Sequence, residues 1–388
     1  MKIAVVGCGP GGLASALFLH RAGHQVTLFD QFETPQPLGS GLLIQPSGQA
    51  VLDRLGLLDQ IKRVAAPVTR LYGINTAGGK RALDMQYRYL GADVCAFGIH
   101  RASLFDILFN AAKSDGIDIR PAHKLTGAES LEGAVRPIFA GSDGETFDLL
   151  VDAGGAHSPL TQGEPVILPF AALWTTVDLP DGSDIARAAL DQRYLGSHKM
   201  AGIMPIGINP DSGNQGAALF WSIEPGQWPV LRRRGLGAWQ HEFCALWPEA
   251  EAFVDQIGSL DALTLALYRH RTGSPVSRPR IFHIGDSWHA TSPQLGQGAN
   301  MALLDAQAFA SAVCEASDLP DIARRYRHAR ADHVALYQAL SYAFTPLYQS
   351  TSRVLPVLRD SIVHHGARLP LVRTIIAQIV SGNLGRFG

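Results

Sequence analysis

The chain has 388 residues, of which 46% are hydrophobic and 17% charged, and its formal net charge is −1. This composition excludes a disordered chain and leaves enough length for two domains that share a sizeable core. Because the longest basic run covers only residues 232 to 234, the charge pattern gives no footprint for nucleic acid or an anionic membrane surface. We therefore expect a small-molecule partner.

The cysteines and the N-terminus indicate where the protein works. The four cysteines form no C-x-x-C pair, which argues against a zinc site and a disulfide framework: Cys8, Cys95, Cys244 and Cys314. The first predicted strand begins at Lys2, so we expect no cleavable signal, and no apolar stretch is long enough for a transmembrane segment. We expect a reduced, cytoplasmic setting.

Residues 1 to 30 predict a strand, a glycine turn, a helix and a second strand. Residues 3 to 6 and 26 to 29 are short apolar runs, whereas Leu13 and Leu17 have the spacing of one helix face. Residues 31 to 65 are turn-rich and then helical, and short β segments follow to about residue 100. A helix within residues 100 to 116, ending at Gly116, and further short strands to residue 152 complete this part.

The turn after the first strand has the G-x-G-x-x-G spacing of a dinucleotide-binding fingerprint. Its glycines are Gly7, Gly9 and Gly12, with Pro10 and Gly11 inside the motif. The first glycine permits a tight turn, the second lets the backbone approach a pyrophosphate, and the third allows close packing of helix and strand. Asp30, followed by Gln31, ends the second strand, where a carboxylate binds a ribose diol and repels a 2′-phosphate. The motif therefore predicts FAD or NAD(H) rather than NADP(H).

The rest of the chain divides into three further parts. Residues 166 to 275 contain β segments with Pro and Gly turns and a Trp-rich helical piece, so we expect a second, inserted domain there. The first domain, residues 1 to 165, then resumes over residues 276 to 345. Residues 346 to 388 are predicted to be helical, and we expect helix breaks at Pro346, Pro356 and Pro370.

The segment over residues 280 to 310 favours FAD over NAD. Asp286 follows a strand and a glycine, where a carboxylate can hold sugar-like hydroxyls. Pro293, Gly296 and Gly298 then form a loop with few side chains that leads into a helix. A flat ring could lie against this loop with its negative edge at the helix N-terminus.

At this point the sequence resembles a known family, the class A flavoprotein monooxygenases, which are FAD-dependent aromatic hydroxylases typified by para-hydroxybenzoate hydroxylase and include salicylate-hydroxylase-like enzymes. The resemblance covers the N-terminal unit, "HRASLFDIL", "LLVDAGGAHS" and residues 280 to 310, in the order of the family. It implies an α/β fold: a Rossmann-like FAD-binding domain with an inserted β-sheet substrate domain and C-terminal helices. It also implies non-covalent FAD, reduced transiently by NADH or NADPH, and a hydroperoxide at the flavin C4a that hydroxylates an aromatic or polyketide-like substrate.

The resemblance assigns roles residue by residue. The first glycine motif and Asp30 would bind the ADP part of FAD, Arg101 would contact the cofactor, and Asp286 would bind the ribityl chain. Pro293 would lie beside the flavin ring, with no acid or base role assigned to it. Backbone contacts to the pyrimidine edge would come from Gly296, Gly298, Ala299 and Asn300.

One turn departs from the family pattern. The family usually has an Asp directly before the second glycine of "DAGGAHS", and this position is Gly154 here, while Asp152 occupies a position that is commonly Gly. Gly154 can still approach the cofactor closely. The change raises doubt about the nicotinamide half-reaction, unless Asp152 or Ser158 supplies an equivalent contact.

The substrate site is predicted from the second domain. Met204, Pro205, Phe220 and Trp221 suit an apolar aromatic substrate, and Gln45 is a further candidate contact. Glycines 39, 41 and 48 suit close-fitting backbone on the other side of the flavin. A base for a phenolic substrate could be His198 or His289, between which the sequence does not choose.

Alternative functions stay open. The chain could be an FAD-dependent oxidase or dehydrogenase, a monooxygenase reduced by a separate partner, or a flavin-binding partner protein without turnover. "LFWSIEP" lacks the pattern of flavin-dependent halogenases and predicts a strand. The C-terminal segment, with apolar residues at helical spacing, could cover the flavin domain or lie on a membrane or partner. We expect a monomer or homodimer.

Overall fold

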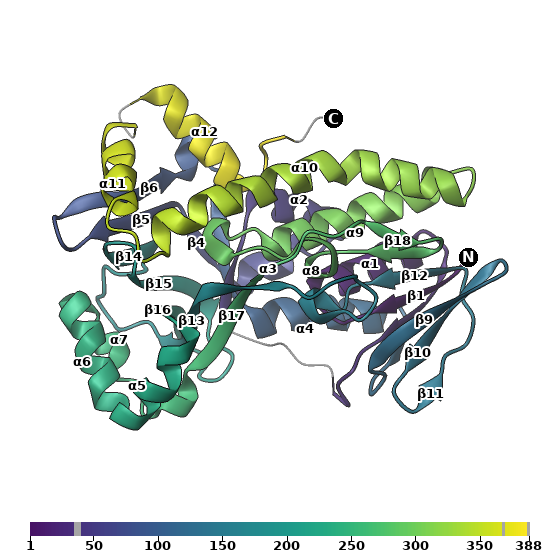
Figure 1. The fold of residues 1–388 in the computed structure, drawn as a ribbon, viewed down its shortest axis with the longest axis horizontal. Helices are drawn as coiled ribbons and strands as arrows, with labels where there is room; N and C mark the ends of the chain where they lie inside the picture. The colour runs from purple at the N-terminus through teal and green to yellow at the C-terminus, as the bar shows by residue number, and fades with distance from the viewer. Residues whose placement is uncertain (35–39, 367–368, 386–388) are drawn as a thin grey trace.

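The structure is a computed structural model that describes residues 1–34, 40–366 and 369–385. Figure 1 shows a large α/β body that carries both a central sheet and a long helix, with a second sheet and a helical cluster at one end. The first sheet has the strand order β18 (Val276–Arg278), β19 (Ile281–His283), β12 (Leu149–Asp152), β1 (Lys2–Val6), β2 (Gln25–Phe29) and β8 (Asp118–Arg120).

The strands from β19 to β8 are parallel to their neighbours, and β18 pairs antiparallel at the margin. Val6 of β1 pairs with Asp152 of β12 on one side and with Phe29 of β2 on the other. Because the carboxyl ends of parallel strands share one edge, the segments after β1, β2, β12 and β19 all begin at that edge. The strand that follows β1 in the chain, β2, lies on one side of it, whereas β19 lies on the opposite side, next to β12. Ligands bind at the carboxyl edge of a parallel sheet where the strand order reverses in this way, so we expect a ligand here.

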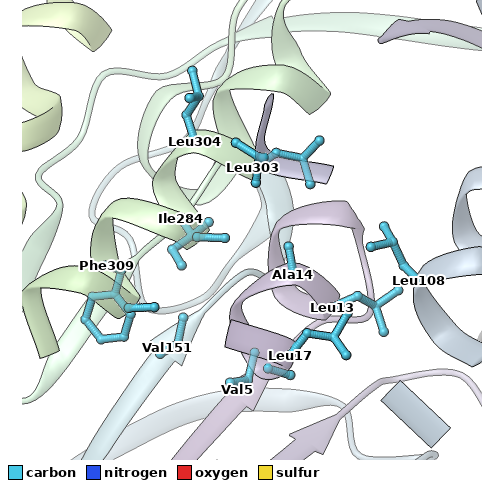
Figure 2. Close-up of a cluster of buried hydrophobic side chains, with 14 of the residues drawn as sticks. Val5, Leu13, Ala14, Leu17, Leu108, Val151, Ile284, Leu303, Leu304 and Phe309 are labelled. Carbon is cyan, nitrogen blue, oxygen red and sulfur yellow. The ribbon is translucent and has the colours of Figure 1, made fainter. Parts of the chain in front are cut away.

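One face of this sheet is covered by helices. α1 (Pro10–Arg21), α4 (Arg101–Ser114), α9 (Gly298–Glu315) and α10 (Leu319–Tyr348) share one buried cluster with the strands. Figure 2 shows how side chains from α1, α4, α9, β1, β12 and the segment directly after β19 meet there: Val5, Leu13, Ala14, Leu17, Leu108, Val151, Ile284, Leu303, Leu304 and Phe309. Apolar side chains at helical spacing on α1 thus lie on the strands, as the sequence pattern predicts.

The other face is covered by a small antiparallel sheet. Its strands are β11 (Ser142–Asp143), β10 (Ala134–Phe139) and β9 (Leu125–Leu131). Phe139 of this sheet packs against Phe29 of β2, with ring centroids 4.7 Å apart. Both faces of the parallel strands are therefore buried, which explains their nearly continuous apolar sequences.

The second large sheet has the order β17 (Thr264–His270), β13 (Val166–Asp178), β16 (Gln215–Ile223), β15 (Lys199–Ile208), β14 (Ala189–Leu195), β5 (Arg70–Asn75) and β6 (Lys80–Gln86). Two of these strands, β5 and β6, come from the part of the chain that we assign to the first domain. The predicted second domain, residues 166 to 275, therefore contains only part of the sheet. β5 joins this sheet by pairing in parallel with β14, from which it is far apart in the sequence. The bounds of the second domain stay a prediction.

Side chains on this sheet alternate between two environments. One face packs on α5 (Trp228–Arg234), α6 (Leu236–Leu246) and α7 (Glu251–Val254). The other face, with Met204 and Phe220, is turned towards a third small sheet and α10. That small sheet consists of β3 (Gly41–Ile44), β7 (Ala96–His100) and β4 (Ala66–Val68), and α2 (Pro46–Arg54) and α3 (Leu58–Val64) lie between β3 and β4 in the chain.

The C-terminal part is helical, with one difference from the prediction. α10 continues through Pro346 and ends at Tyr348, so the predicted break at Pro346 is wrong. Pro346 lies in the last turn, where the missing N–H costs only one helical hydrogen bond. Pro356 and Pro370 lie in the first turns of α11 (Leu355–Gly366) and α12 (Pro370–Ser381), positions that tolerate proline. Within the described ranges, no helix is both long enough and apolar enough to cross a membrane.

Candidate cofactor site

The glycine turn after β1 combines two crowded positions with one open one. A side chain at Gly12 would collide with the Gly7 carbonyl oxygen, and one at Gly7, whose φ is +107°, would collide with the Ala153 carbonyl oxygen. In contrast, no atom lies within 4 Å of the place where a Gly9 side chain would begin. Gly7 and Gly12 are thus required by packing, whereas Gly9 leaves room for a group to approach the backbone.

Two helices begin at the site without a side-chain cap. α1 begins at Pro10 after Gly9, and α9 begins at Gly298 after Gln297, and neither preceding residue caps the helix. The first-turn N–H groups of a helix have no partner within the helix. Since the helix dipole also favours negative charge there, the starts of α1 and α9 can bind phosphate or an electron-rich ring edge.

Asp30 supports the glycine turn from the end of β2. Its carboxylate is buried and accepts hydrogen bonds from the backbone N–H groups of Cys8, at 2.8 Å, and Phe32, at 3.0 Å. Asp30 therefore fixes the turn. Each carboxylate oxygen has a second lone pair, so the predicted contact with a ribose remains compatible with these bonds. Gln31 follows and is exposed.

The turn after β12 is closed by its own acid. Asp152 is completely buried and accepts hydrogen bonds from the Gly154 N–H, at 2.9 Å, and the Ser158 hydroxyl, and it pairs with Nδ1 of His283 at 2.8 Å. Nε2 of His283 is in turn bonded to the Ser277 hydroxyl, at 2.7 Å. Asp152 and Ser158 point into the interior and bind each other, which argues against either one replacing the missing acid towards the cofactor.

Asp286 and Arg101 lie within electrostatic range of each other. Asp286 begins α8 (Asp286–His289) just beyond β19, and Arg101 begins α4 just beyond β7; both side chains are exposed. Desolvation by surrounding protein raises the pKa of Asp286, while the positive charges of His289 and Arg101 oppose this shift. Desolvation likewise lowers the pKa of Arg101, and the charge of Asp286 opposes it. The structure thus brings two predicted cofactor contacts of opposite charge into electrostatic reach.

A buried ion network lies beneath Asp286. Asp305 of α9 accepts a hydrogen bond from the Gly285 N–H at 2.9 Å and pairs with His289 at 2.5 Å and with Nε of Arg330 at 2.7 Å. Burial alone would raise the pKa of Asp305, but the charges and hydrogen bonds of His289 and Arg330 lower it to about 2. The network fixes the turn that presents Asp286.

Sequence reasoning missed Asp305 and Arg330, although an acid among apolar helix residues in "MALLDAQAF" is a usable signal. The same contacts decide between the two candidate bases. His289 is buried and bound to Asp305, so its role is structural. His198 is exposed in the hairpin between β14 and β15.

The loop before α9 is held by Asn300. The Asn300 side chain is completely buried; it accepts a hydrogen bond from the Gln45 N–H at 2.9 Å and donates one to the Leu43 carbonyl, also at 2.9 Å. A side chain at Gly48 would collide with Asn300, which explains that glycine. Gly296 has a φ of +61°, a conformation that favours glycine. Gly39, predicted with this region, lies outside the described residues.

Other parts of the loop remain accessible. Pro293 opens η6 (Pro293–Leu295) and is exposed, as is Gly298, while Ala299 is half-buried in the first turn of α9. Their side chains occupy little space. The loop therefore presents backbone and a proline ring to the site, as the sequence predicts for a surface beside a flat ring.

The predicted substrate contacts separate into two groups. Met204 and Phe220 lie on the sheet face that is turned towards β3 and α10. Trp221 points to the opposite face and packs on Phe243 of α6, with ring centroids 5.2 Å apart, so it cannot line the same surface. The strand period of two places neighbours such as Phe220 and Trp221 on opposite faces.

Two further candidates are partly occupied by contacts within the protein. Gln45 is completely buried and accepts a hydrogen bond from the Tyr87 hydroxyl at 2.5 Å, whereas its Nε2 has no hydrogen-bond partner among the described residues, so a ligand contact of Gln45 stays a prediction. Pro205 abuts β7 through its carbonyl oxygen, against which any side chain at Gly98 would collide. Tyr87, which sequence reasoning missed, gives no motif signal.

These features fit FAD: an open glycine turn, two uncapped helix starts, a carboxylate within electrostatic range of an arginine, and a loop poor in side chains before α9. The family described as "FAD binding domain" matches residues 1–338. The chain belongs to the FAD-dependent aromatic hydroxylases. This aromatic hydroxylase is therefore an FAD-dependent monooxygenase.

Curated relatives agree with this assignment along nearly the whole chain. The aromatic hydroxylase is 25% identical to 6-methylpretetramide 4-monooxygenase of Streptomyces rimosus, covering 98% of this chain and 92% of that protein. It is 24% identical to an FAD-dependent urate hydroxylase of Mycolicibacterium vanbaalenii, covering 99% and 98% of the two chains. Identity to 6-hydroxynicotinate 3-monooxygenase of Bordetella bronchiseptica is 25%, over 88% of this chain and 90% of that protein.

Solved structures show the same fold. Klebsiella pneumoniae HpxO, crystallised with FAD and uric acid, superposes with a TM-score of 0.81 at 19% identity and covers 99% of this chain and 98% of its own. The p-nitrophenol 4-monooxygenase of Pseudomonas putida superposes with a TM-score of 0.79, at 19% identity and with 99% and 98% coverage. The α/β fold predicted from the sequence is thereby confirmed.

Proposed function

We propose that this aromatic hydroxylase inserts one oxygen atom of O2 into an aromatic or polyketide-like small molecule, with NADH or NADPH as the electron source. Substrate, O2, reduced nicotinamide and one proton are consumed, and hydroxylated product, water and oxidised nicotinamide are formed. The relatives named for 6-methylpretetramide, urate and 6-hydroxynicotinate support this substrate class. The same proposal includes a monomer or homodimer as the working unit.

The observation that carries the proposal is the sheet edge at which the open glycine turn, Asp286 and the Pro293 loop meet. When bound, FAD supplies the redox chemistry that passes electrons to O2 and oxygen to the substrate. The residues of the chain bind and orient it: the Gly9 turn and the start of α1 would bind the pyrophosphate, and Asp286 the ribityl hydroxyls. Met204 and Phe220 supply an apolar sheet face that excludes water near the substrate.

The experiment that tests the proposal is anaerobic mixing of FAD-loaded protein with NADH or NADPH, alone and with a panel of phenols, followed by the flavin absorbance. We expect bleaching that one aromatic compound accelerates. Aerobic incubation with that compound should then yield a product that is heavier by one oxygen atom. Bleaching without any oxygenated product, over the whole panel, would contradict the proposal.

A second candidate is favoured by the closed turn after β12. Because Asp152 occupies the Gly154 N–H and no acid faces outward from position 154, direct use of a nicotinamide could be lost and electrons could come from a separate reductase or from the substrate. In that case neither nucleotide bleaches the flavin, whereas dithionite does. Re-oxidation of the dithionite-reduced enzyme with substrate and O2 then distinguishes a partner-dependent monooxygenase, which forms a product with one added oxygen atom and water, from an oxidase, which reduces O2 to H2O2 without oxygenating the substrate.

A further inference from the structure

The exposed large apolar side chains are concentrated on the last two helices. Between residues 354 and 375, seven of them are exposed, and the most exposed are Val354, at 73%, and Leu371, at 72%. The set consists of Val354, Val357, Leu358, Ile362, Leu369, Leu371 and Ile375, which we call the C-terminal apolar surface. Spacings of four residues, as in Val354, Leu358 and Ile362, place members on one stripe of α11, and Leu371 and Ile375 do so on α12.

The inner faces of the same helices are firmly packed. Arg359 and Asp360 of α11 are buried and form an ion pair at 2.7 Å, and Asp360 also accepts a hydrogen bond from Asn75 of β5 at 2.6 Å. Ala377 and Val380 of α12 join the buried cluster that contains Met204. Figure 1 shows α11 and α12 beside β5 and β6 at one end of the molecule. The C-terminal apolar surface is therefore an outer face of anchored helices.

The charges around this surface are positive. Among residues 349 to 366 and 369 to 385, which the structure describes, the arginines are Arg353, Arg359 and Arg373, and the single acid, Asp360, is paired with Arg359 inside the fold. Arg353 is exposed beside the apolar stripe of α11. At α12, Arg373 and Arg88 both lie over the ring of Tyr89, at 5.4 and 5.6 Å from its centroid. The near-zero net charge of the whole chain conceals this local excess.

We propose that the C-terminal apolar surface docks on an anionic lipid bilayer, with α11 and α12 lying in the interface rather than across it. Aliphatic stripes with a basic rim are the pattern of helices that bind the surface of anionic membranes. A second copy of the chain fits less well, because a symmetric contact would bring arginines to arginines, and the described residues of α11 and α12 include no acid other than the buried Asp360. The members of the surface are also all Val, Leu or Ile, whereas protein interfaces are enriched in aromatic residues. The inference does not depend on the substrate proposed above.

The test is flotation of the FAD-loaded full chain with vesicles of phosphatidylcholine alone or of equal parts phosphatidylcholine and phosphatidylglycerol. We expect flotation with the anionic vesicles only, and less of it at high salt. Leu371→Gln with Ile375→Gln should weaken binding by at least about tenfold, because two aliphatic side chains no longer enter the interface. Arg353→Gln should weaken binding severalfold at low salt only.

The matched control is Val166→Gln with Ile167→Gln, a second exposed aliphatic pair that lies on β13, at 62% and 57% exposure. It should float like the unmodified protein, and all variants should retain the flavin absorbance and melting temperature. The proposal is overturned if the protein floats with neither vesicle, or if the control pair weakens flotation as much as the α12 pair. It is also overturned if the α12 pair instead converts a dimer to a monomer.

Discussion

The turns that follow β1 and β12 are neighbours at the same sheet edge, because Val6 pairs with Asp152. Both contain glycines, yet they use their backbone donors differently. Around Gly9 the turn is open, and α1 begins without a side-chain cap. Around Gly154 the turn is closed, because Asp152 accepts its N–H and also binds Ser158 and His283.

The comparison shows that glycines at a ligand-binding edge can have two different roles. An open turn keeps its donors for a ligand, and its stability comes from packing, here of Gly7 and Gly12. A closed turn satisfies its own donors and supports its neighbour: any side chain at Gly7 would collide with Ala153 in the turn after β12. In this enzyme the turn after β12 supports the turn after β1 by packing against it.

The largest effect is expected within the open turn. Gly12→Ala places a methyl group against the Gly7 carbonyl, so the turn must move and the protein should lose several kcal/mol of stability, about 3 or more. Gly9→Val meets nothing in the structure and should fold normally but bind little FAD. Thermal melting without added FAD, and the flavin content after purification, separate the two variants. Full flavin content in Gly9→Val would refute the pyrophosphate assignment.

The next effect breaks the closed turn. Asp152→Ala leaves His283, Ser158 and the Gly154 N–H without their buried acceptor, so we expect a loss of about 3 kcal/mol in the free energy of unfolding. Denaturant titration measures it. Arg136→Ala removes an exposed ion pair with Glu129 and serves as a control that should change stability by less than about 1 kcal/mol. Equal losses would mean that the Asp152 network does not support the turn.

A related pair of variants tests whether positions 152 and 154 exclude each other as acids. A side chain at Gly154 would begin 3.0 Å from a carboxylate oxygen of Asp152, so Gly154→Asp brings two carboxylates together and should destabilise the protein by about 2 kcal/mol. Asp152→Gly with Gly154→Asp removes the repulsion, so its loss of stability should be smaller than the sum of the losses of Asp152→Gly and Gly154→Asp measured separately. Its rate of flavin bleaching by NADH and NADPH, compared with the unmodified enzyme, shows whether an outward acid changes nicotinamide use.

The open turn after β1 could be predicted from the sequence, whereas the closed turn after β12 could not. The glycine spacing, Asp30, Asp286 and the Pro293 loop are local patterns with a direct physical reason. The structure places the first three just beyond the carboxyl ends of β1, β2 and β19, and the Pro293 loop between α8 and α9; their contacts with FAD stay predictions. The Asp152 network depends on His283 and Ser277, which β18 and β19 bring alongside β12. No local sequence pattern predicts these hydrogen bonds, because parallel strand pairing joins residues that are far apart in the chain.

The second sheet shows the same limit. Residue type alone suggested that Phe220 and Trp221 line one pocket, but a strand turns adjacent side chains to opposite faces. The participation of β5 and β6 could not be predicted either, because β5 pairs with β14 across the predicted domain bound and β6 then pairs with β5. Helix breaks at proline depend on position within the helix, and Pro346 lies where the cost is small.

The acid side of the pH profile should report the network under Asp286. Asp305 has its pKa lowered from an ordinary 3.8 to about 2, so its charged form stabilises the fold above pH 3.8 and this contribution is lost as the pH falls towards 2. The corresponding stability is about 2 kcal/mol. Asp305→Asn should therefore lower the free energy of unfolding most at neutral pH, and the difference from the unmodified protein should shrink below pH 3.8. A difference that stays constant down to pH 2 would show that the carboxylate charge is not the cause.

The smallest effect is expected where α12 contacts the loop before α9. The Gln297 side chain, directly before α9, donates a hydrogen bond to the Val380 carbonyl of α12 at 2.5 Å, in a buried setting. Gln297→Leu removes this tie and leaves the carbonyl unpaired, so we expect about 1 kcal/mol less stability and FAD binding that is weaker by a few-fold. The matched control is Gln294→Leu, in the same loop as Gln297, which loses a partly buried side-chain hydrogen bond to Gln349. If flavin titration gives equal affinities for both variants, the loop is positioned by Asn300 alone and α12 only covers it.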